Sequence, residues 1–261
     1  MLFFLLACTQ PSKDTGQFGT WELFWSDEFD GAASSPPDSA KWVHDVGGDG
    51  WGNNQLEYDT DSTNNVRLTG DGFLEIRAVR EPFEGKEYTS GRIKTKDRFA
   101  HSYGRYEAKI KLPAGQGLWP AFWMLGANFD DVGWPSCGEI DIMEMRGNDP
   151  YTTMGTIHGP GYAGGSGIGG ELSAEQSFAD DFHVFRVDVD PQHLRWFVDD
   201  EPYLTITPGD LPVGTSWVYD HDFFLLLNLA VGGNFLADPT EETEFPASMF
   251  VDYVRAYRRT E

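Results

Sequence analysis

The chain has 261 residues, and its 40% hydrophobic and 15% aromatic content is typical of a folded protein. Its 42 acidic and 19 basic residues give a formal net charge of -23, which would repel polyphosphate and excludes DNA and RNA as partners. Short apolar runs punctuated by glycine and proline exclude disorder, and none approaches the roughly 18 apolar residues of a membrane span.

The first residues read as a leader followed by a flexible linker. Residues 1–7 form an apolar burst that ends before Cys8, and polar residues follow. This arrangement resembles the lipobox of a bacterial lipoprotein signal, although the burst is short and no basic residue precedes it. We predict a leader and linker over residues 1–20, a single domain over residues 21–261, and an extracytoplasmic protein that is secreted or anchored on the bacterial surface through lipidated Cys8. The other cysteine, Cys137, is expected to be a small buried hydrophobe without a disulfide partner.

Period-two alternation of apolar and polar residues predicts a mostly β chain. The predicted strands are residues 73–79, 106–112, 185–190, 194–198 and 251–257, and residues 223–231 read as a strand buried on both faces. Only residues 173–178 suggest a short helical turn. The pattern indicates an all-β fold in which two antiparallel sheets form a sandwich with Greek-key connections.

An aromatic pair stands out in residues 118–125. Period two places Trp119 and Trp123 on one face with the small Ala121 between them. The remaining large apolar residues of this run supply a core side: Phe122, Met124 and Leu125. Two indoles separated by a small residue form a flat trough, on which the apolar C–H face of a sugar can stack. Either tryptophan alone would be assigned to the core, but the pair predicts a ligand-binding face.

Three carboxylates follow at Glu139, Asp141 and Glu144. On a regular strand Glu144 would lie on the opposite face from the other two, among isoleucines, where an unpaired carboxylate is strongly destabilising. A β-bulge near Ile142 and Met143 would shift the phase by one residue and return Glu144 to the face of Glu139 and Asp141. We therefore predict that bulge.

A ridge of three carboxylates suits the hydrolysis of a glycosidic bond. Retaining hydrolysis needs an ionised carboxylate that attacks the anomeric carbon and a protonated one, about 5 to 5.5 Å away, that donates to the leaving oxygen. We assign attack to Glu139 and proton donation to Glu144, with Asp141 holding Glu139 in place and helping to keep Glu144 protonated. Two alternatives are a solvated acidic strand face and a divalent metal site, to which His158 could add a ligand.

A second strand through residues 154–157 is expected to pair with the acidic strand. If the hairpin folds about Asp149 and Pro150, His158 lies roughly opposite Asp141 and can tune or orient the acids. The alternative is a histidine with a purely structural role.

These residues resemble glycoside hydrolase family 16, particularly its bacterial laminarinase-type endo-β-1,3-glucanases, over residues 25–257. The most specific part is residues 134–144, where Trp-Pro-Ser-Cys-Gly leads into a strand similar to the bulged active-site strand of the family rather than to the shorter strand of lichenases. Further similar segments are residues 51–54, 90–92, 119–125, 158–162 and 228–234. Gln55 and Glu57 are interchanged relative to the commoner order.

The resemblance implies a concanavalin A-like β-jelly roll with a concave substrate cleft, and retaining endo-hydrolysis of β-1,3-glucan such as laminarin, extending to mixed β-1,3/1,4-glucan. It gives the three acids the roles assigned above and implies sugar contacts from further residues: Asn53, Arg92, Trp119, Trp123, His158 and Asn234. No cofactor is required for the chemistry. A structural Ca²⁺ on the convex side would be bound by Asp252 with main-chain oxygens of Glu28 and Gly72. We expect a monomer.

Two other functions fit the same fold. A galactanase such as a carrageenase or agarase could use the same aromatic trough, although the acidic net charge disfavours sulfated galactans. A non-catalytic glucan-binding lectin or sensor would bind the polymer without turnover, and it would not need an acid/base pair.

Overall fold

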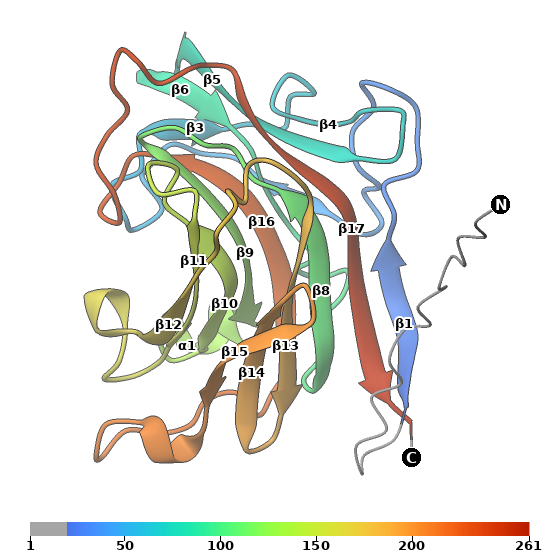
Figure 1. Ribbon diagram of the computed structural model, residues 1–261, viewed down its shortest axis with the longest axis vertical. Helices are drawn as coiled ribbons and strands as arrows, with labels where there is room; N and C mark the ends of the chain where they lie inside the picture. Colours follow the sequence, from blue (N-terminus) through green and yellow to red (C-terminus); the bar gives the residue numbers. More distant parts are fainter. Residues whose placement is uncertain (1–19, 261) are drawn as a thin grey trace, which may run out of the picture.

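Two sheets stacked face to face make up the described part of the chain, residues 20–260 of the computed structural model (Figure 1). The ten-stranded sheet has the order β15-β14-β13-β8-β17-β5-β6-β3, with β1 paired to β17 and β4 paired to β5. The seven-stranded sheet has the order β12-β11-β10-β9-β16-β7-β2. All neighbouring strands are antiparallel except β3 and β6. This is the predicted all-β, two-sheet architecture.

The ten-stranded sheet contains β1 (Trp21–Asp27), β3 (Glu57–Asp59), β4 (Val66–Leu68), β5 (Leu74–Phe83), β6 (Lys86–Ser90), β8 (Gly104–Lys111), β13 (His183–Asp190), β14 (His193–Val198), β15 (Glu201–Ile206) and β17 (Ala247–Arg259). The seven-stranded sheet contains β2 (Val43–Asp45), β7 (Arg92–Lys94), β9 (Leu118–Gly126), β10 (Glu139–Met145), β11 (Thr152–His158), β12 (Ile168–Ser173) and β16 (Phe223–Val231). The short helices are α1 (Phe129–Val132), η1 (Gly164–Ser166) and η2 (Pro208–Asp210). None of the helices within residues 20–260 is long and apolar enough to cross a bilayer.

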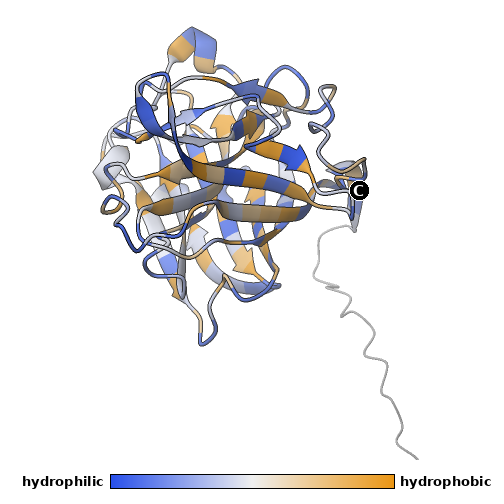
Figure 2. Ribbon diagram, turned by 90° about the horizontal axis from the view of Figure 1, so that it is seen from above, coloured by the Kyte–Doolittle hydropathy of each residue, from blue (hydrophilic) through white to orange (hydrophobic). Residues whose placement is uncertain are grey.

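The hydrophobic core lies between the sheets, because each sheet turns one apolar face inward. Figure 2 shows hydrophobic and hydrophilic residues interspersed along the strands. In β8 the inward residues Tyr106, Ala108 and Ile110 are fully buried and alternate with polar residues, as the period-two pattern predicts. All nine residues of β16 are buried, which confirms the predicted strand with two buried faces. Loops and side chains therefore cover part of the outer face of the seven-stranded sheet.

The predicted strands are confirmed, with β17 extending further at both ends than residues 251–257. The helical turn predicted at residues 173–178 is wrong. The backbone N–H of Ala174 donates to the carbonyl of Tyr151, and that of Phe178 donates to the carbonyl of Pro150. These bonds to a distant loop replace the local bonds of a helix, and Phe178 is buried in the core.

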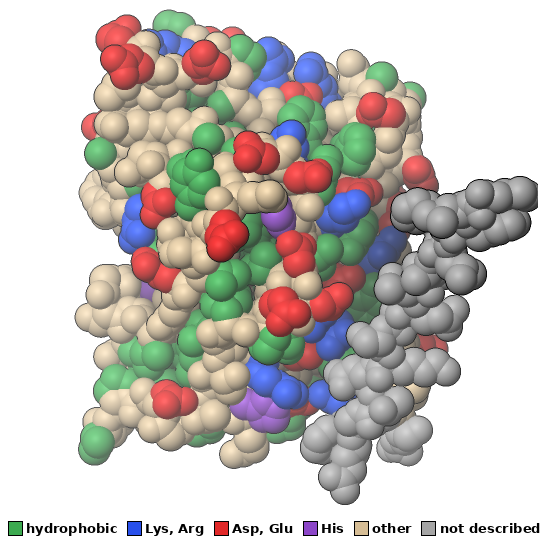
Figure 3. Space-filling view, in the orientation of Figure 1, with side chains coloured by type: hydrophobic (Ala, Val, Ile, Leu, Met, Phe, Trp, Pro, Cys, Tyr) green, Lys and Arg blue, Asp and Glu red, His purple; other side chains and the backbone are tan. Residues whose placement is uncertain are grey.

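The two ends of the described chain lie side by side, because β1 pairs with β17 (Figure 1). The expected lipidation site Cys8 lies outside the described residues. Cys137 is buried as a free thiol, as predicted, and burial raises its pKa to about 11. Acidic side chains are spread over the visible face of the molecule rather than gathered in one patch (Figure 3).

Candidate active site

The predicted bulge is present in β10. Asp141 pairs with Trp123 on β9, and the register then shifts so that Met143 pairs with Phe122 and Glu144 with Ala121. The pairing of β10 with β11 shifts over the same residues, between Asp141 and Glu144. The bulge therefore inserts one extra residue into β10.

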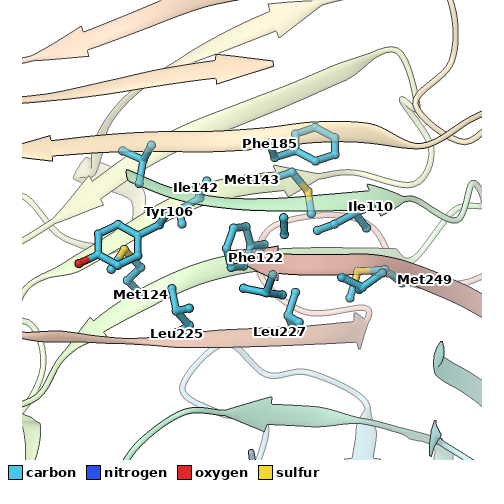
Figure 4. Close-up of a cluster of buried hydrophobic side chains, with 14 of the residues drawn as sticks. Tyr106, Ile110, Phe122, Met124, Ile142, Met143, Phe185, Leu225, Leu227 and Met249 are labelled. Atoms are coloured by element: carbon cyan, nitrogen blue, oxygen red, sulfur yellow. The ribbon is translucent and has the colours of Figure 1, made fainter. Parts of the chain in front are cut away.

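The bulge turns two consecutive side chains toward the core. Ile142 and Met143 are 1% and 0% exposed, and both lie in the hydrophobic cluster of Figure 4. Next to the bulge, the indole Nε1 of Trp196 donates to the main-chain oxygen of Asp141 at 2.8 Å. The same indole lies so close to Gly155 that a Cβ there would be 2.4 Å from the ring. A glycine opposite the bulge thus leaves the space in which Trp196 anchors it.

As a result, Glu139, Asp141 and Glu144 lie on the open face of the seven-stranded sheet, the face that points away from the core. Burial raises the pKa of Glu139 to about 8, with a further rise from Asp141. Burial also raises the pKa of Asp141 and that of Glu144 to about 8. Three carboxyl groups in this environment cannot all be ionised at neutral pH, so the trio can hold an anion and a proton at the same time.

His158 extends from β11 toward the acids. Its Nε2 atom is 3.1 Å from Oδ2 of Asp141 and 3.7 Å from Oε1 of Glu139. The predicted register is wrong, because the Cα partner of His158 is Glu139 and that of Asp141 is Thr156. His158 is displaced along β10 from Asp141 to Glu139 for two reasons: the bulge adds one residue, and the turn closes nearer to Asp149. Its ring still reaches Asp141.

The same side chains form a possible ligand set for a metal ion. Within residues 20–260, Glu139, Asp141 and His158 are the one group of at least three His, Cys, Asp or Glu residues whose ligand atoms all lie within 4.8 Å of one another.

His158 lowers the pKa of Glu139 and also that of Glu144. His158 thus favours the ionised forms of both neighbouring carboxyl groups.

Trp134 is a site residue to which the sequence pattern gave no separate role. Its side chain is 46% exposed, and its ring centroid lies 6.2 Å from that of His158. A hydrogen bond from Trp134 lowers the pKa of Glu139. An exposed indole next to a buried carboxylate can both stabilise the anion and contact a ligand. Its place directly before the acidic strand was the available signal.

Trp119 lies directly beside Glu144. The indole Nε1 donates to Oε1 of Glu144 at 3.0 Å, and this bond lowers the pKa of that carboxyl. Trp119 is only 8% exposed, because its ring packs against that of Phe235 at a centroid distance of 4.8 Å. Phe235 is in turn covered by the Arg146 guanidinium, 4.1 Å from its ring centroid.

Trp123 lies further along the open face and is less buried than Trp119. Its Nε1 atom donates to Oδ1 of Asn228 at 2.8 Å, which fixes the plane of the ring. Leu125 was predicted to face the core, but it belongs to a separate small cluster with Cys137, Phe224 and Leu226. Period two places Leu125 on the face of Trp119 and Trp123, and this cluster forms the apolar floor beside them.

Three residues implied by the resemblance meet at the β7–β2 edge of the open face. The loop between β2 and β3 carries Asn53, whose main-chain oxygen accepts a bond from the Asn234 N–H at 2.8 Å. The Nδ2 atom of Asn54 donates to Oδ1 of Asn234 at 2.9 Å, across 180 residues of sequence. Arg92 donates from Nε to Oδ2 of Asp45 at 3.0 Å. We call this group of residues, Asn53, Asn54, Arg92 and Asn234, the amide corner.

The interchanged residues Gln55 and Glu57 lie beneath this corner. Both are buried, and Oε2 of Glu57 accepts the N–H of Val231 at 2.7 Å. Burial raises the pKa of Glu57 to about 7, and burial together with Glu57 raises the pKa of Asp59 well above its usual range. The interchange thus places the carboxyl group of Glu57 under the amide corner, where it accepts a hydrogen bond from Val231 at the end of β16.

The residues suggested for calcium lie on the outer face of the ten-stranded sheet. A carboxylate and main-chain carbonyls are donors of the kind that calcium takes. However, Oδ2 of Asp252 already accepts a bond from Nζ of Lys109 at 2.7 Å. The side chain of Glu28 is bound by Arg255 through two hydrogen bonds. The donor type therefore fits, but calcium would have to displace the Lys109 ammonium.

Comparison with known proteins gives a consistent set of matches. Residues 49–220 match the family described as Glycosyl hydrolases family 16. The chain is 41% identical over 271 residues to a Beta-glucanase of Rhodothermus marinus, covering 100% of this chain and 94% of the relative. It is 39% identical over 258 residues to a Glucan endo-1,3-beta-glucosidase of Cryptopygus antarcticus, covering 92% and 93%. The structure of the endo-beta-1,3-glucanase from Pyrococcus furiosus matches with a TM-score of 0.88 and 44% identity, over 93% of this chain and 96% of the other.

Proposed function

The chain belongs to glycosyl hydrolase family 16, and from this we propose that it is an endo-β-1,3-glucanase that cleaves laminarin-like glucans with retention of anomeric configuration. The fold is the jelly roll of the family's laminarinases. The observation that carries the proposal is the β10 bulge, which brings Glu139, Asp141 and Glu144 to one face of the sheet. Mixed β-1,3/1,4-glucan is a second substrate of the same site.

Glu139 is the nucleophile in this proposal. Its carboxylate attacks the anomeric carbon, the C–O bond to the leaving sugar breaks, and Glu144 gives its proton to the departing oxygen. Glu144 then takes a proton from water, and the water oxygen attacks the anomeric carbon. The bond between that carbon and Glu139 breaks, which frees the sugar and restores the carboxylate. Burial and Asp141 raise the pKa of both carboxyls, and His158 lowers the pKa of both, while Trp134 lowers that of Glu139 and Trp119 lowers that of Glu144. The roles of the two acids are therefore assigned from the family resemblance and not from these pKa shifts.

The sugar chain lies along the open face of the seven-stranded sheet. The partly exposed Trp123 offers indole surface, the mostly buried Trp119 can contact the sugar only beside Glu144, and His158 contacts the sugar beside the acids. Asn53, Arg92 and Asn234 line the corner at the far edge and supply hydrogen-bond donors and acceptors to hydroxyl groups. The chemistry uses two carboxyl groups and water, and it therefore requires no cofactor.

The alternatives are less well supported. A glucan-binding lectin needs no acid/base pair, and an unused trio of buried carboxyl groups would only destabilise the fold. A galactanase remains compatible with the same trough. The relatives named above, which match over nearly their whole length, are glucanases.

The test is the release of reducing sugar from laminarin. Wild type is expected to produce a mixture of oligosaccharides, and the first-formed anomer, followed by proton NMR, is expected to be β. Glu139→Ser should lose activity by at least about a thousandfold, since it removes the nucleophile. Glu22→Gln, which neutralises a surface carboxylate paired with Arg258, is the matched control and should remain fully active. Equal activity of wild type and Glu139→Ser would disprove the site assignment, and faster release from agarose or carrageenan would favour the galactanase.

Three further properties complete the proposal. An extracytoplasmic location follows from the size of the polymeric substrate, and the proposed lipid anchor at Cys8 lies outside the described residues. Calcium has no part in the reaction, and we propose it only as a structural ion at Asp252, with main-chain oxygens of Glu28 and Gly72. The protein is proposed to act as a monomer, because the acids, the tryptophans and the amide corner come from one chain.

A further inference from the structure

The loop between β2 and β3 holds a tryptophan in an unusual backbone conformation. Trp51 has a φ of 49°, and it lies between Gly50 at 84° and Gly52 at 78°. A bulky residue rarely adopts a left-handed conformation, and such strain persists only where surrounding contacts hold it. The contacts that hold Trp51 therefore indicate what its side chain is needed for.

One of these contacts is with Arg92. The guanidinium carbon lies over two indole rings, 4.6 Å from the centroid of Trp51 and 4.8 Å from that of Trp123. Asp45 binds Nε of the same guanidinium at 3.0 Å, and the Arg92 side chain is only 13% exposed. The flat cation thus bridges the two tryptophans, and little of it is left to contact a sugar.

This bridge connects the edge of the sheet to the catalytic strand. Trp123 is the Cα partner of Asp141, and its ring is fixed by Asn228. Trp51 lies beside Asn53 in the amide corner. In the sheet order, β7 is three strands from β10, which corresponds to about 14 Å at the usual strand spacing. Only a chain of several sugars can reach from the acids to Trp51.

We propose that Arg92 is a positioning residue that holds the Trp51 indole as an outer glucose-stacking platform, so that the preference for long glucan chains depends on the Trp51–Arg92–Trp123 bridge. This inference rests on the proposed glucanase function and replaces the direct sugar contact assigned to Arg92 with a positioning role. The occupant is a neutral sugar, since an indole face and nearby Asn53 and Asn234 match its C–H face and hydroxyl groups.

Arginine is suited to this role because its guanidinium is planar and can stack on aromatic faces while it binds a carboxylate at its edge. Lysine keeps the charge and could still pair with Asp45, but its ammonium is compact and cannot span two rings. The proposal therefore predicts that Arg92→Lys behaves like a loss of the Trp51 platform rather than like wild type.

The experiment compares polymeric laminarin with the shortest laminari-oligosaccharides that wild type cleaves. Trp51→Ala and Arg92→Lys should each raise KM for laminarin about tenfold while kcat changes by less than about twofold, because they remove binding far from the reacting bond. The kcat/KM for the shortest substrates should stay unchanged. Lys94→Met is the matched control, since Lys94 binds the same Asp45 but neither indole, and it should leave both constants unchanged.

The double variant decides whether Arg92 acts through Trp51. If it does, Arg92→Lys combined with Trp51→Ala has the same KM as Trp51→Ala alone, whereas independent sugar contacts would multiply to about a hundredfold and overturn the proposal. A fall in kcat on the shortest substrates would also overturn it, and thermal melting of each variant identifies loss of folding. If wild type itself fails to cleave laminarin, the proposed function is wrong. Failure of the Trp51 proposal is recognised differently, by a wild type that cleaves laminarin and variants that do not show the expected rise in KM.

Discussion

The indole Nε1 of Trp119 donates a hydrogen bond to Oε1 of Glu144 at 3.0 Å, on the face of the sheet where the acid trio lies. The bond stabilises the ionised carboxylate and so lowers the pKa of Glu144, against the larger rise caused by burial. The pKa of the residue proposed as general acid is therefore adjusted by a tryptophan that is itself proposed to contact the sugar.

Trp119→Phe removes this donor but keeps an aromatic ring against Phe235. Without the bond the pKa of Glu144 rises, so the protonated acid survives to higher pH. The alkaline limb of the kcat/KM profile on laminarin should move upward by about one pH unit, given the strength of a hydrogen bond to a charged group. Trp123→Phe is the control, because its Nε1 bonds to the neutral Asn228. If the alkaline limb of kcat/KM lay at the same pH in Trp119→Phe and Trp123→Phe, the prediction would be contradicted.

His158→Gln is expected to move the acid limb, and because His158 also lowers the pKa of Glu144, the alkaline limb should move upward as well. His158 lowers the pKa of Glu139, so its removal raises that pKa. The nucleophile must be ionised, and activity is lost as the pH falls through its pKa; the acid limb of kcat/KM should therefore begin at a higher pH. The surface residue His193, paired with Asp190 on the far sheet, provides the control His193→Gln. An unchanged acid limb in His158→Gln would leave this histidine with only a structural role.

The sequence was sufficient for the sheets and for the bulge. Alternation along β8 and β13 defined their inward faces, and the isoleucines of β10 made an inward Glu144 too costly to accept. Gly155 is a further signal in the sequence, because a glycine inside a strand marks a bulge or the close approach of another group. Here the approaching group is Trp196, which anchors the bulge through Asp141.

Features that depend on distant contacts could not be predicted in the same way. Residues 173–178 have a helical pattern, but the carbonyls of Pro150 and Tyr151 compete for their N–H groups. The partner of His158 depended on a turn whose centre no motif defines. The contacts of Arg92 with two tryptophans depend on the path of a strained loop, which local pattern does not encode.

Calcium binding can be measured by thermal melting in calcium and in EDTA. Because the ion must displace Lys109 from Asp252, Lys109→Met should bind calcium more tightly than wild type. At a concentration one hundred times Kd, calcium would stabilise by about 2.7 kcal/mol, which corresponds to a Tm increase of roughly 5 to 10 °C. Asp252→Asn should abolish the increase, and Lys111→Met, whose ammonium binds a main-chain oxygen, should match wild type. No increase in any variant would rule out this site.

Deletion of Met143 tests the bulge itself. The shortened strand would be regular, and Glu139, Asp141 and Glu144 would still share one face, because side chains two residues apart lie on the same side of a strand. We therefore expect laminarin hydrolysis to persist at a reduced rate, with the free energy of unfolding lowered by about 2 to 5 kcal/mol because a buried methionine is lost.

An alanine inserted between Met143 and Glu144 is the opposite change. It reverses the phase, points Glu144 toward the core, and should abolish hydrolysis even where circular dichroism still reports β structure, because the general acid no longer reaches the glycosidic oxygen. If the folded deletion variant were as inactive as Glu144→Gln, facial alignment would not suffice. The bulge would then have to set the distance between the two carboxyl groups as well as their direction.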